Sequence, residues 1–208
     1  MKTGLTVLAT AVLSAVTLAS CNASVANNHR VENRGKILDT ETLLGKGVIL
    51  RSADGTKMVC QGCTKAEQTV VDFLYERGIR DVNAMSVLLG NIKQESRFHP
   101  NICEGGARVP YERCLRGGYG LIQFTTESRY NGLGNFANRY GGDPSELMTQ
   151  LRYIVNEREW LVVEKYFKTE GLSKDQYMNY AYRWLGWGIY GNRGNYSNEY
   201  VGKLKVVS

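Results

Sequence analysis

The sequence predicts a mainly helical domain of the α+β class, in which a short β or loop insertion follows the second helix. Three observations lead to this prediction. From residue 64 onward, hydrophobic residues recur with helical spacing, and capping sequences open several of the helical segments. Between residues 97 and 122 the helical period is lost. The 208-residue chain is 43% hydrophobic and 22% charged, which suits one soluble, well-cored domain with a tail.

Residues 1–20 are typical of a secretory signal. A single Lys2 precedes an apolar run that is short for a membrane span, and Cys21 follows. The ending Leu-Ala-Ser-Cys resembles the lipobox of bacterial lipoproteins, although an ordinary signal peptide that contains a cysteine is the alternative. We expect a lipoprotein signal peptide whose cleavage leaves Cys21 acylated. The protein would then be exported and lipid-anchored in the cell envelope, on the periplasmic face of the inner or outer membrane.

Residues 21–63 are expected to form a tether and a possible small hairpin. The stretch CNASVANNHRVENRG is polar and has few apolar anchors. The stretch GVILRSADGTKMVC alternates and carries β-branched residues around an Asp54-Gly55 turn. The cored domain is therefore expected to span residues 64–208.

Helices are expected to fill most of residues 64–208. The first two run from a Thr64–Glu67 capping box to Gly78 and from Asp81 as N-cap to Ser96, the second with a buried stripe of Met85, Leu88, Leu89 and Ile92. A third helix is expected over 125–142, and a fourth over 143–160, with Asp143 as cap, Pro144 at N1 and Glu146 at N3. A fifth is expected to run from a Ser173–Gln176 capping box to Gly186. The last is expected from Ser197 to Val206.

Four cysteines remain after Cys21, and an even number in an exported protein predicts two disulfides. Cys103–Cys114 is the favoured pair because it closes a local loop. Cys60–Cys63 would be a tight ring, so cross-pairing stays open. A redox or zinc site on these cysteines is the alternative, but helices rather than a βαβ unit follow the CQGC sequence. We expect neither a metal nor a cofactor.

The formal net charge of +6 favours an anionic partner such as nucleic acid, an acidic membrane surface or an acidic wall polymer. No run of Lys and Arg and no nucleic-acid-binding motif is present, so we do not expect nucleic acid. The oligomeric state is not predictable from these features.

Glu95 ends the hydrophobic stripe of the second expected helix, three residues after Ile92. Partial desolvation there raises the pKa of a carboxyl group. An acid that stays protonated near neutral pH can donate its proton to a leaving oxygen, as glycoside cleavage requires. The alternative is a solvated glutamate at a helix end.

The motifs around Glu95 resemble the lysozyme-like superfamily of goose-type lysozymes, lytic transglycosylases and phage tail lysozymes. The Glu95-Ser96 pair is followed by GGYGLIQF at 117–124 and QLRYIVNE at 150–157, and the most similar group is the phage tail lysozymes. The resemblance, over residues 66–187, implies a lysozyme-like catalytic domain. It makes Glu95 the general acid on the bond after N-acetylmuramic acid in peptidoglycan glycan strands. The lipobox and four further cysteines depart from this group and favour an envelope-anchored enzyme.

The same resemblance places the glycine-containing segment along the sugar groove. Gly118 and Gly120 would let the backbone approach the sugar, and Gln123 would exchange hydrogen bonds with it. Tyr119 is expected to face the groove, as are Trp187 and Tyr190 from a later glycine-rich loop. Phe124 is expected in the core.

The second catalytic group is left open. Glu104, Glu112 and Glu127 are candidates for a second carboxylate, but each is also explained as a loop or first-turn charge. A lysozyme would need such a carboxylate or a positioned water, whereas a lytic transglycosylase needs one Glu. A non-catalytic peptidoglycan-binding lipoprotein would use the groove without acid catalysis.

Overall fold

The computed structural model describes residues 55–208. The expected signal peptide, Cys21 and most of the tether lie outside the described residues. The described part contains seven α-helices, namely α2 (Lys65–Glu76), α3 (Val82–Ser96), α4 (Glu127–Tyr140), α5 (Leu147–Ile154), α6 (Arg158–Phe167), α7 (Lys174–Leu185) and α8 (Arg193–Lys203). The mainly helical fold class is therefore confirmed.

Local capping chemistry starts three helices where the sequence predicts. At α2 the Thr64 hydroxyl accepts from the Glu67 amide, and the Glu67 carboxylate accepts from the Thr64 amide at 2.6 Å. The same reciprocal pair opens α7 at Ser173. Asp81 accepts from the Ala84 amide at 3.0 Å and caps α3. These caps satisfy amide groups that a helix start leaves unpaired.

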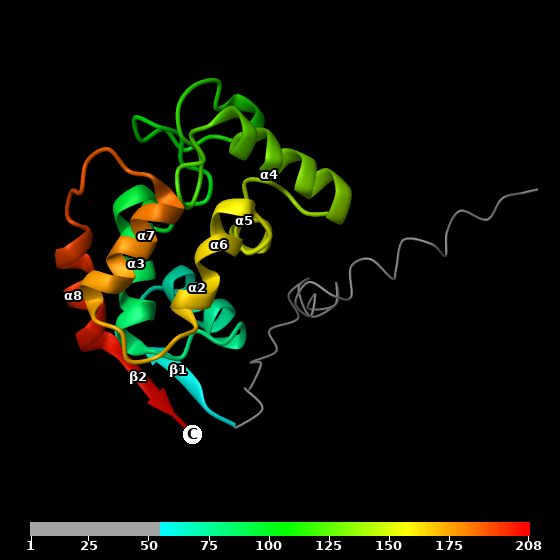
Figure 1. The fold of residues 1–208 in the computed structure, drawn as a ribbon. Helices are drawn as coiled ribbons and strands as arrows, with labels where there is room; N and C mark the ends of the chain where they lie inside the picture. Colours follow the sequence, from blue (N-terminus) through cyan, green and yellow to red (C-terminus); the bar gives the residue numbers. More distant parts are fainter. Residues whose placement is uncertain (1–54) are drawn as a thin grey trace, which may run out of the picture. The chain divides into compact units, whose positions relative to one another are not determined.

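Helix α3 is the central element, and α8 packs along one side of it (Figure 1). Its predicted stripe of Met85, Leu88, Leu89 and Ile92 is buried. Gly90 allows the close approach of α8, because a Cβ at Gly90 would lie 2.6 Å from the Ser197 amide nitrogen and 2.9 Å from the Arg193 carbonyl oxygen. The helix that ends at Glu95 is thus held directly against α8.

The insertion after α3, which was expected to contain loops and short strands, has isolated β-bridges in place of regular strands. Residues 97–126 contain the isolated bridges Ile102–Arg108 and Cys103–Tyr119 and one short 3-10 helix, η1 (Tyr111–Arg113). This segment lies at the top of the domain in Figure 1, between α3 and α4.

The prediction of one continuous helix over 143–160 is wrong, because α5 and α6 share this region. The Asp143 carboxylate caps a turn by accepting from the Ser145 amide at 2.7 Å, and α5 begins only after Glu146. The chain then breaks at Glu157, whose extended backbone (φ −75°, ψ 151°) precedes α6. The break places the Glu157 carboxylate in the interior, where it binds Arg129.

The C-terminal helix starts and ends earlier than the expected Ser197–Val206 range. After α8, strand β2 (Leu204–Val207) pairs antiparallel with β1 (Lys57–Cys60), with Lys57 opposite Val207 and Cys60 opposite Leu204. The second arm of the expected hairpin therefore forms β1, but it pairs with the C-terminal strand; the first arm lies outside the described residues. Met58, Cys60 and Leu204 are buried. Burial of these apolar side chains explains why β1 pairs with β2, although β2 lies far away in the sequence.

Both disulfides are local. Cys60 pairs with Cys63 and Cys103 pairs with Cys114, with Cα–Cα distances of 5.4 and 5.6 Å. The first ring follows β1, and the second closes the insertion loop before Gly118. The structure therefore selects local pairing over the cross-pairing that the sequence leaves open.

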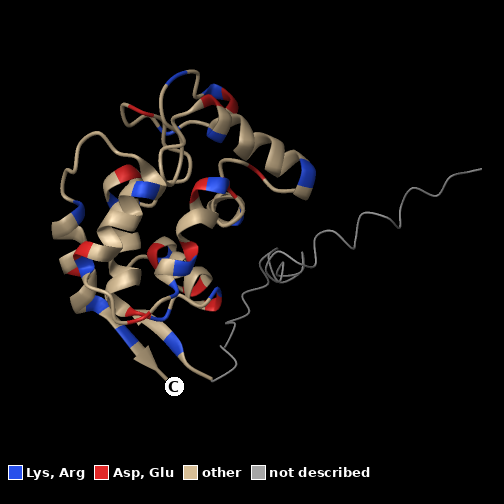
Figure 2. Cartoon of the chain, viewed as in Figure 1, with Lys and Arg blue, Asp and Glu red and all other residues tan. Residues whose placement is uncertain are grey.

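Charged residues are spread over several helices and loops of the described part, with both signs present (Figure 2). In residues 55–208, none of the helices has the length and apolarity that a bilayer crossing requires.

Candidate active site

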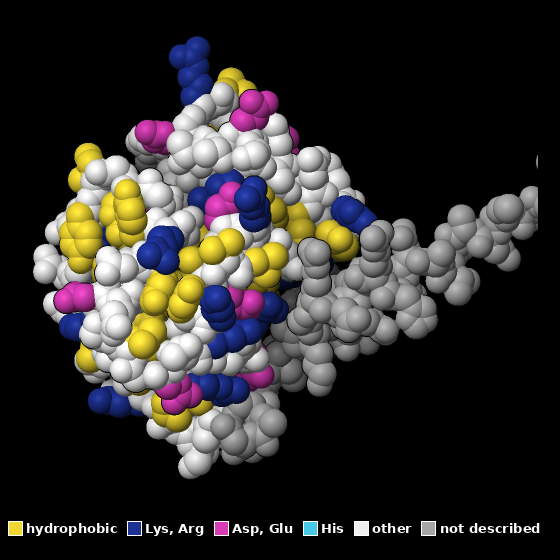
Figure 3. All heavy atoms as spheres, viewed as in Figure 1, with side chains coloured by type: hydrophobic (Ala, Val, Ile, Leu, Met, Phe, Trp, Pro, Cys, Tyr) yellow, Lys and Arg dark blue, Asp and Glu magenta, His cyan; other side chains and the backbone are white. Residues whose placement is uncertain are grey.

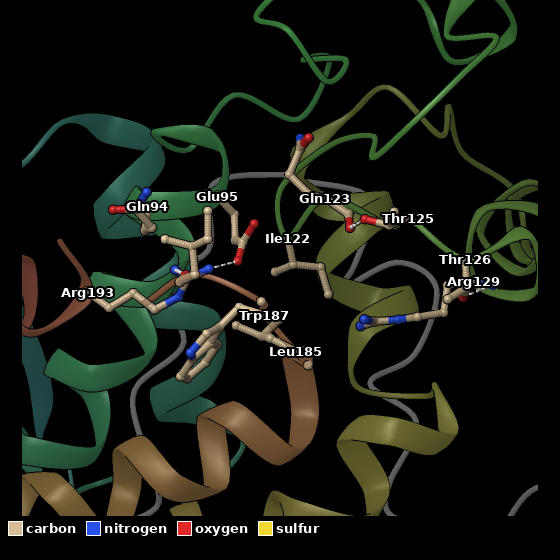
Figure 4. Close-up of a pocket in the computed structure, with 13 residues that line it drawn as sticks. Gln94, Glu95, Ile122, Gln123, Thr125, Thr126, Arg129, Leu185, Trp187 and Arg193 are labelled. Atoms are coloured by element: carbon tan, nitrogen blue, oxygen red, sulfur yellow. Dashed lines mark hydrogen bonds and ion pairs between the residues drawn. The ribbon is translucent and has the colours of Figure 1, made fainter. Parts of the chain in front are cut away.

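A pocket of about 640 Å³ opens where the end of α3 meets the insertion, α4 and the α7–α8 loop. Its walls are formed by Gln94, Glu95, Ile122, Gln123, Thr125, Thr126, Arg129, Leu185, Gly186, Trp187, Gly188, Ile189 and Arg193. Figure 4 shows Glu95 and Arg193 on one side, Arg129 and Thr126 on the other, and Ile122 between them. The volume lies within the range typical of small-molecule sites.

Glu95 is placed in this pocket by the last turn of α3, and its side chain is only 16% exposed. Burial raises the pKa of its carboxyl group, and the nearby Arg193 and the more distant Arg129 oppose that rise. The net direction is upward. Glu95 therefore combines access to the pocket with the raised pKa expected of a proton donor.

Arg193, at the start of α8, is the closest partner of Glu95. Its Nη2 donates to Glu95 Oε1, while Nη1 donates to the carbonyl oxygens of Ile189 at 2.9 Å and Tyr190 at 2.8 Å. The guanidinium carbon lies 4.5 Å from the centre of the Trp187 ring. No local pattern in the sequence marks Arg193, because its partners lie in other elements.

Gln123, which was expected to contact the sugar, also lines the pocket. Its Nε2 donates to the Gly120 carbonyl oxygen at 3.0 Å, and its backbone is left-handed, with φ 53°. A left-handed non-glycine residue is uncommon and strained, and such residues concentrate at functional sites. The carboxamide oxygen accepts no hydrogen bond from a described residue, and the carboxamide lies at the edge of the group of pocket side chains, pointing away from Glu95 and Arg129 (Figure 4).

The structure corrects the expectation for Tyr119, which is fully buried and lies outside the pocket wall. Its hydroxyl donates to the Val109 carbonyl oxygen at 3.1 Å, and its ring packs against Tyr111 and Tyr130. Phe124 is buried in the core, as predicted.

Gly118 and Gly120 also lie outside the pocket wall. A Cβ at Gly120 would lie 2.5 Å from the Gln150 amide nitrogen, and one at Gly118 would lie 2.8 Å from Gln123 Cβ. These glycines therefore make room for neighbouring protein side chains, where the sequence suggested room for a sugar. Local sequence shows that a small residue is needed but not what fills the space.

The two aromatic residues of the α7–α8 loop have different positions. Trp187 forms part of the pocket wall, whereas Tyr190 lies outside it and is 49% exposed. Their ring centres are 6.3 Å apart, and Trp187 also contacts Tyr182 at 5.2 Å. Figure 3 shows hydrophobic side chains at the edge of the domain where this loop runs. An aromatic surface thus continues outward from the pocket.

None of the three candidates for a second carboxylate reaches the pocket wall. Glu104 accepts from the Gly118 amide at 3.0 Å, Glu112 belongs to η1, and Glu127 lies in the first turn of α4. All three are exposed. Among the described residues that line the pocket, Glu95 is the one carboxylate.

Arg129 is a pocket residue that the sequence reasoning missed. Its Nε and Nη2 donate to the two oxygens of Glu157 at 2.9 and 2.5 Å, and Trp184 Nε1 donates to the same carboxylate at 2.8 Å. Burial raises the pKa of Glu157, and the Arg129 hydrogen bonds oppose the rise. The QLRYIVNE motif ends at Glu157, the partner of Arg129, and is the sequence feature that could have pointed to this pair.

The four cysteines of the described residues are paired in disulfides, and residues 55–208 contain no group of three or more His, Cys, Asp or Glu side chains placed to hold a metal ion.

Residues 65–202 match the model of a family described as phage tail lysozyme. The chain belongs to the phage tail lysozyme family. The matched range runs from the start of α2 into α8 and includes every pocket residue. No curated protein and no solved structure matches the chain. Membership of the phage tail lysozyme family confirms the lysozyme-like fold and supports a peptidoglycan-lytic function with peptidoglycan as the substrate class.

Proposed function

We propose that this protein cleaves peptidoglycan glycan strands at the β-1,4 bond between N-acetylmuramic acid and N-acetylglucosamine, as a muramidase with Glu95 as general acid. The observation that carries the proposal is the placement of Glu95, a mostly buried carboxyl group with a raised pKa in the wall of an open pocket. Family membership supplies the substrate class.

The pocket supports a simple division of roles. Protonated Glu95 donates its proton to the glycosidic oxygen as the bond breaks, and positive charge develops on the sugar ring. The carboxamide of Gln123 exchanges hydrogen bonds with an N-acetyl or hydroxyl group. The face of Trp187 packs against a sugar ring, and Tyr190 extends this surface away from the reacting bond.

Transglycosylation is the second candidate outcome, and one observation favours it. Glu95 is the single carboxylate among the described residues of the pocket wall, whereas most hydrolytic glycosidases use two. With one acid, the 6-hydroxyl of the muramic acid can attack its own anomeric carbon and give a 1,6-anhydro end. A positioned water at the same place gives a reducing end.

Mass analysis of the products tests these alternatives. Protein lacking residues 1–21 is incubated with purified glycan strands, and the fragments are examined for reducing or 1,6-anhydro ends. We expect Glu95→Gln to lower the rate by about 10²- to 10⁴-fold. The control is Glu112→Gln, which changes an exposed carboxylate away from the pocket. Retained binding without either product would favour a non-catalytic wall-binding protein.

We further propose that acylated Cys21 holds the enzyme at an envelope membrane, where peptidoglycan is within reach. The support is the lipobox-like ending before Cys21. Labelling of growing cells with a tagged fatty acid should mark the wild-type chain and not Cys21→Ser. Recovery of unlabelled wild-type protein in the soluble envelope fraction would reject the anchor.

A further inference from the structure

We propose that Arg193 is a positioning residue that sets the orientation and charge of Glu95 and links this carboxylate to the α7–α8 loop beside the pocket. The inference rests on the proposed function, since it assigns a role in preparing the general acid. It is drawn from the contacts that Arg193 makes on both sides of its guanidinium group.

The guanidinium group joins three parts of the site. Nη2 binds the Glu95 carboxylate, and Nη1 binds two successive carbonyl oxygens of the loop, those of Ile189 and Tyr190. The Trp187 ring covers one face at 4.5 Å. The Arg193 side chain is only 4% exposed. A planar, multiply bonded guanidinium has little freedom to leave this arrangement.

The backbone around Arg193 is also fixed against α3. Gln94 Oε1 accepts from the Asn192 amide at 2.8 Å, so the residue before Arg193 is tied to the residue before Glu95. One turn later, Ser197 packs against Gly90. The two main chains therefore hold Glu95 and Arg193 in register even before their side chains pair.

Arg193 is the dominant charge facing Glu95. The charged side chains in the described pocket wall are Glu95, Arg193 from α8 and Arg129 from α4. Helix α7 contributes the apolar Leu185, and the loop contributes the neutral Trp187. Arg129 is already bound through two hydrogen bonds to Glu157, which offsets its charge. Arg193 accordingly has the largest lowering effect on the pKa of Glu95, against the larger effect of burial.

This balance gives the direction in which the pKa of Glu95 should change when Arg193 is replaced by Gln. Without the Arg193 cation, only the weaker effect of Arg129 opposes burial, so the pKa of Glu95 rises further and the carboxyl group stays protonated to higher pH. A general acid loses activity as pH rises through its pKa. The alkaline limb of the activity profile should therefore move to higher pH in Arg193→Gln, while misorientation of the acid lowers kcat.

A carboxyl-carbon NMR titration of Glu95 tests the charge effect without any activity measurement. We expect the Glu95 midpoint to move up by about one to three pH units in Arg193→Gln. Lys93→Gln is the matched control, because Lys93 makes a separate α3–α8 ion pair with Glu199 at 2.7 Å away from the pocket wall. A midpoint in Arg193→Gln equal to that of Lys93→Gln would overturn the proposal.

Arg193→Lys separates orientation from charge and serves if Arg193→Gln does not fold. Lysine keeps the cation but cannot bond the loop carbonyls and Glu95 in the same fork. We expect a near wild-type midpoint with kcat lowered about 10- to 100-fold. Wild-type kcat in Arg193→Lys would reject the positioning role. A shifted NMR midpoint in a protein without lytic activity would instead reject the proposed function and leave the Arg193–Glu95 coupling in place.

Discussion

Ser96 Oγ donates a hydrogen bond to the carbonyl oxygen of Leu121 at 2.7 Å and so joins the residue after Glu95 to the segment that carries Gln123. Ser96 is buried, and its hydroxyl also accepts from the Phe98 amide at 3.1 Å. That second bond supports the left-handed turn at Arg97 and Phe98, where α3 ends. The two short motifs that resemble lysozymes are thus one physical unit.

Replacing Ser96 by Ala should weaken both the fold and catalysis. The change leaves the buried Leu121 carbonyl oxygen without this donor and should cost about 1–3 kcal/mol of unfolding free energy. Glycan cleavage should fall as Gln123 loses its fixed distance from Glu95. Denaturant unfolding measures the loss of stability, and the amount of glycan product formed measures the loss of cleavage. Thr69→Ala is the control, because that hydroxyl bonds only within its own helix, to the Lys65 carbonyl oxygen; equal losses in both variants would contradict the linkage.

Gly90→Ala should separate α3 from α8. The added methyl group would meet the backbone of α8 at Arg193 and Ser197, and such overpacking costs about 1–3 kcal/mol. Activity should fall with stability because Arg193 moves with α8. Thermal unfolding and a cleavage assay measure both.

The matched control for Gly90→Ala is Gly202→Ala, a change in α8 at a position where a Cβ meets nothing within 4 Å. Alanine is the better helix former, so this change should stabilise the fold by about 0.5–1 kcal/mol. A neutral Gly90→Ala variant would show that the helices can separate without consequence.

The elements that the sequence predicts correctly are those specified by neighbouring residues. The Thr64 and Ser173 capping boxes and the α3 stripe are local patterns, and Glu95 follows from its place at the end of that stripe. Arg193 and β2 depend on partners far along the chain, so no local pattern reveals them. Hydrophobic periodicity also cannot foresee the break at Glu157, because its partners come from other helices.

Glu157→Gln should be strongly destabilising. The variant leaves the guanidinium of Arg129 largely buried and without its carboxylate, and breaking one side of a buried ion pair costs about 3–5 kcal/mol. Urea unfolding of Glu157→Gln, Arg129→Gln and the double variant gives the coupling between the two side chains. The double variant should lose much less than the sum of the single variants. Additive losses would show that the pair is not coupled.

Tyr200→Phe should lower stability in a pH-dependent way. The Tyr200 hydroxyl donates to Glu67, linking α8 to the capping box of α2. Burial raises the pKa of Glu67, but hydrogen bonds from Tyr200 and Thr64 more than offset this and leave the pKa lowered. A carboxylate with a lowered folded-state pKa stabilises the fold above its unfolded pKa, and this stabilisation is lost as pH falls through the folded pKa.

Near neutral pH the Tyr200→Phe variant should lose about 1.5–3 kcal/mol of unfolding free energy, as expected for a hydrogen bond to a charged group. The difference from wild type should narrow as the pH falls through the lowered folded-state pKa of Glu67, because the carboxylate becomes protonated there. Denaturant unfolding at several pH values from neutral to acid measures this difference in unfolding free energy. Tyr180→Phe is the control, because the Tyr180 ring stacks on Tyr166 at a centre distance of 4.0 Å and keeps this contact without its hydroxyl. A loss that stays constant with pH would show that Tyr200 acts through packing rather than through the Glu67 charge.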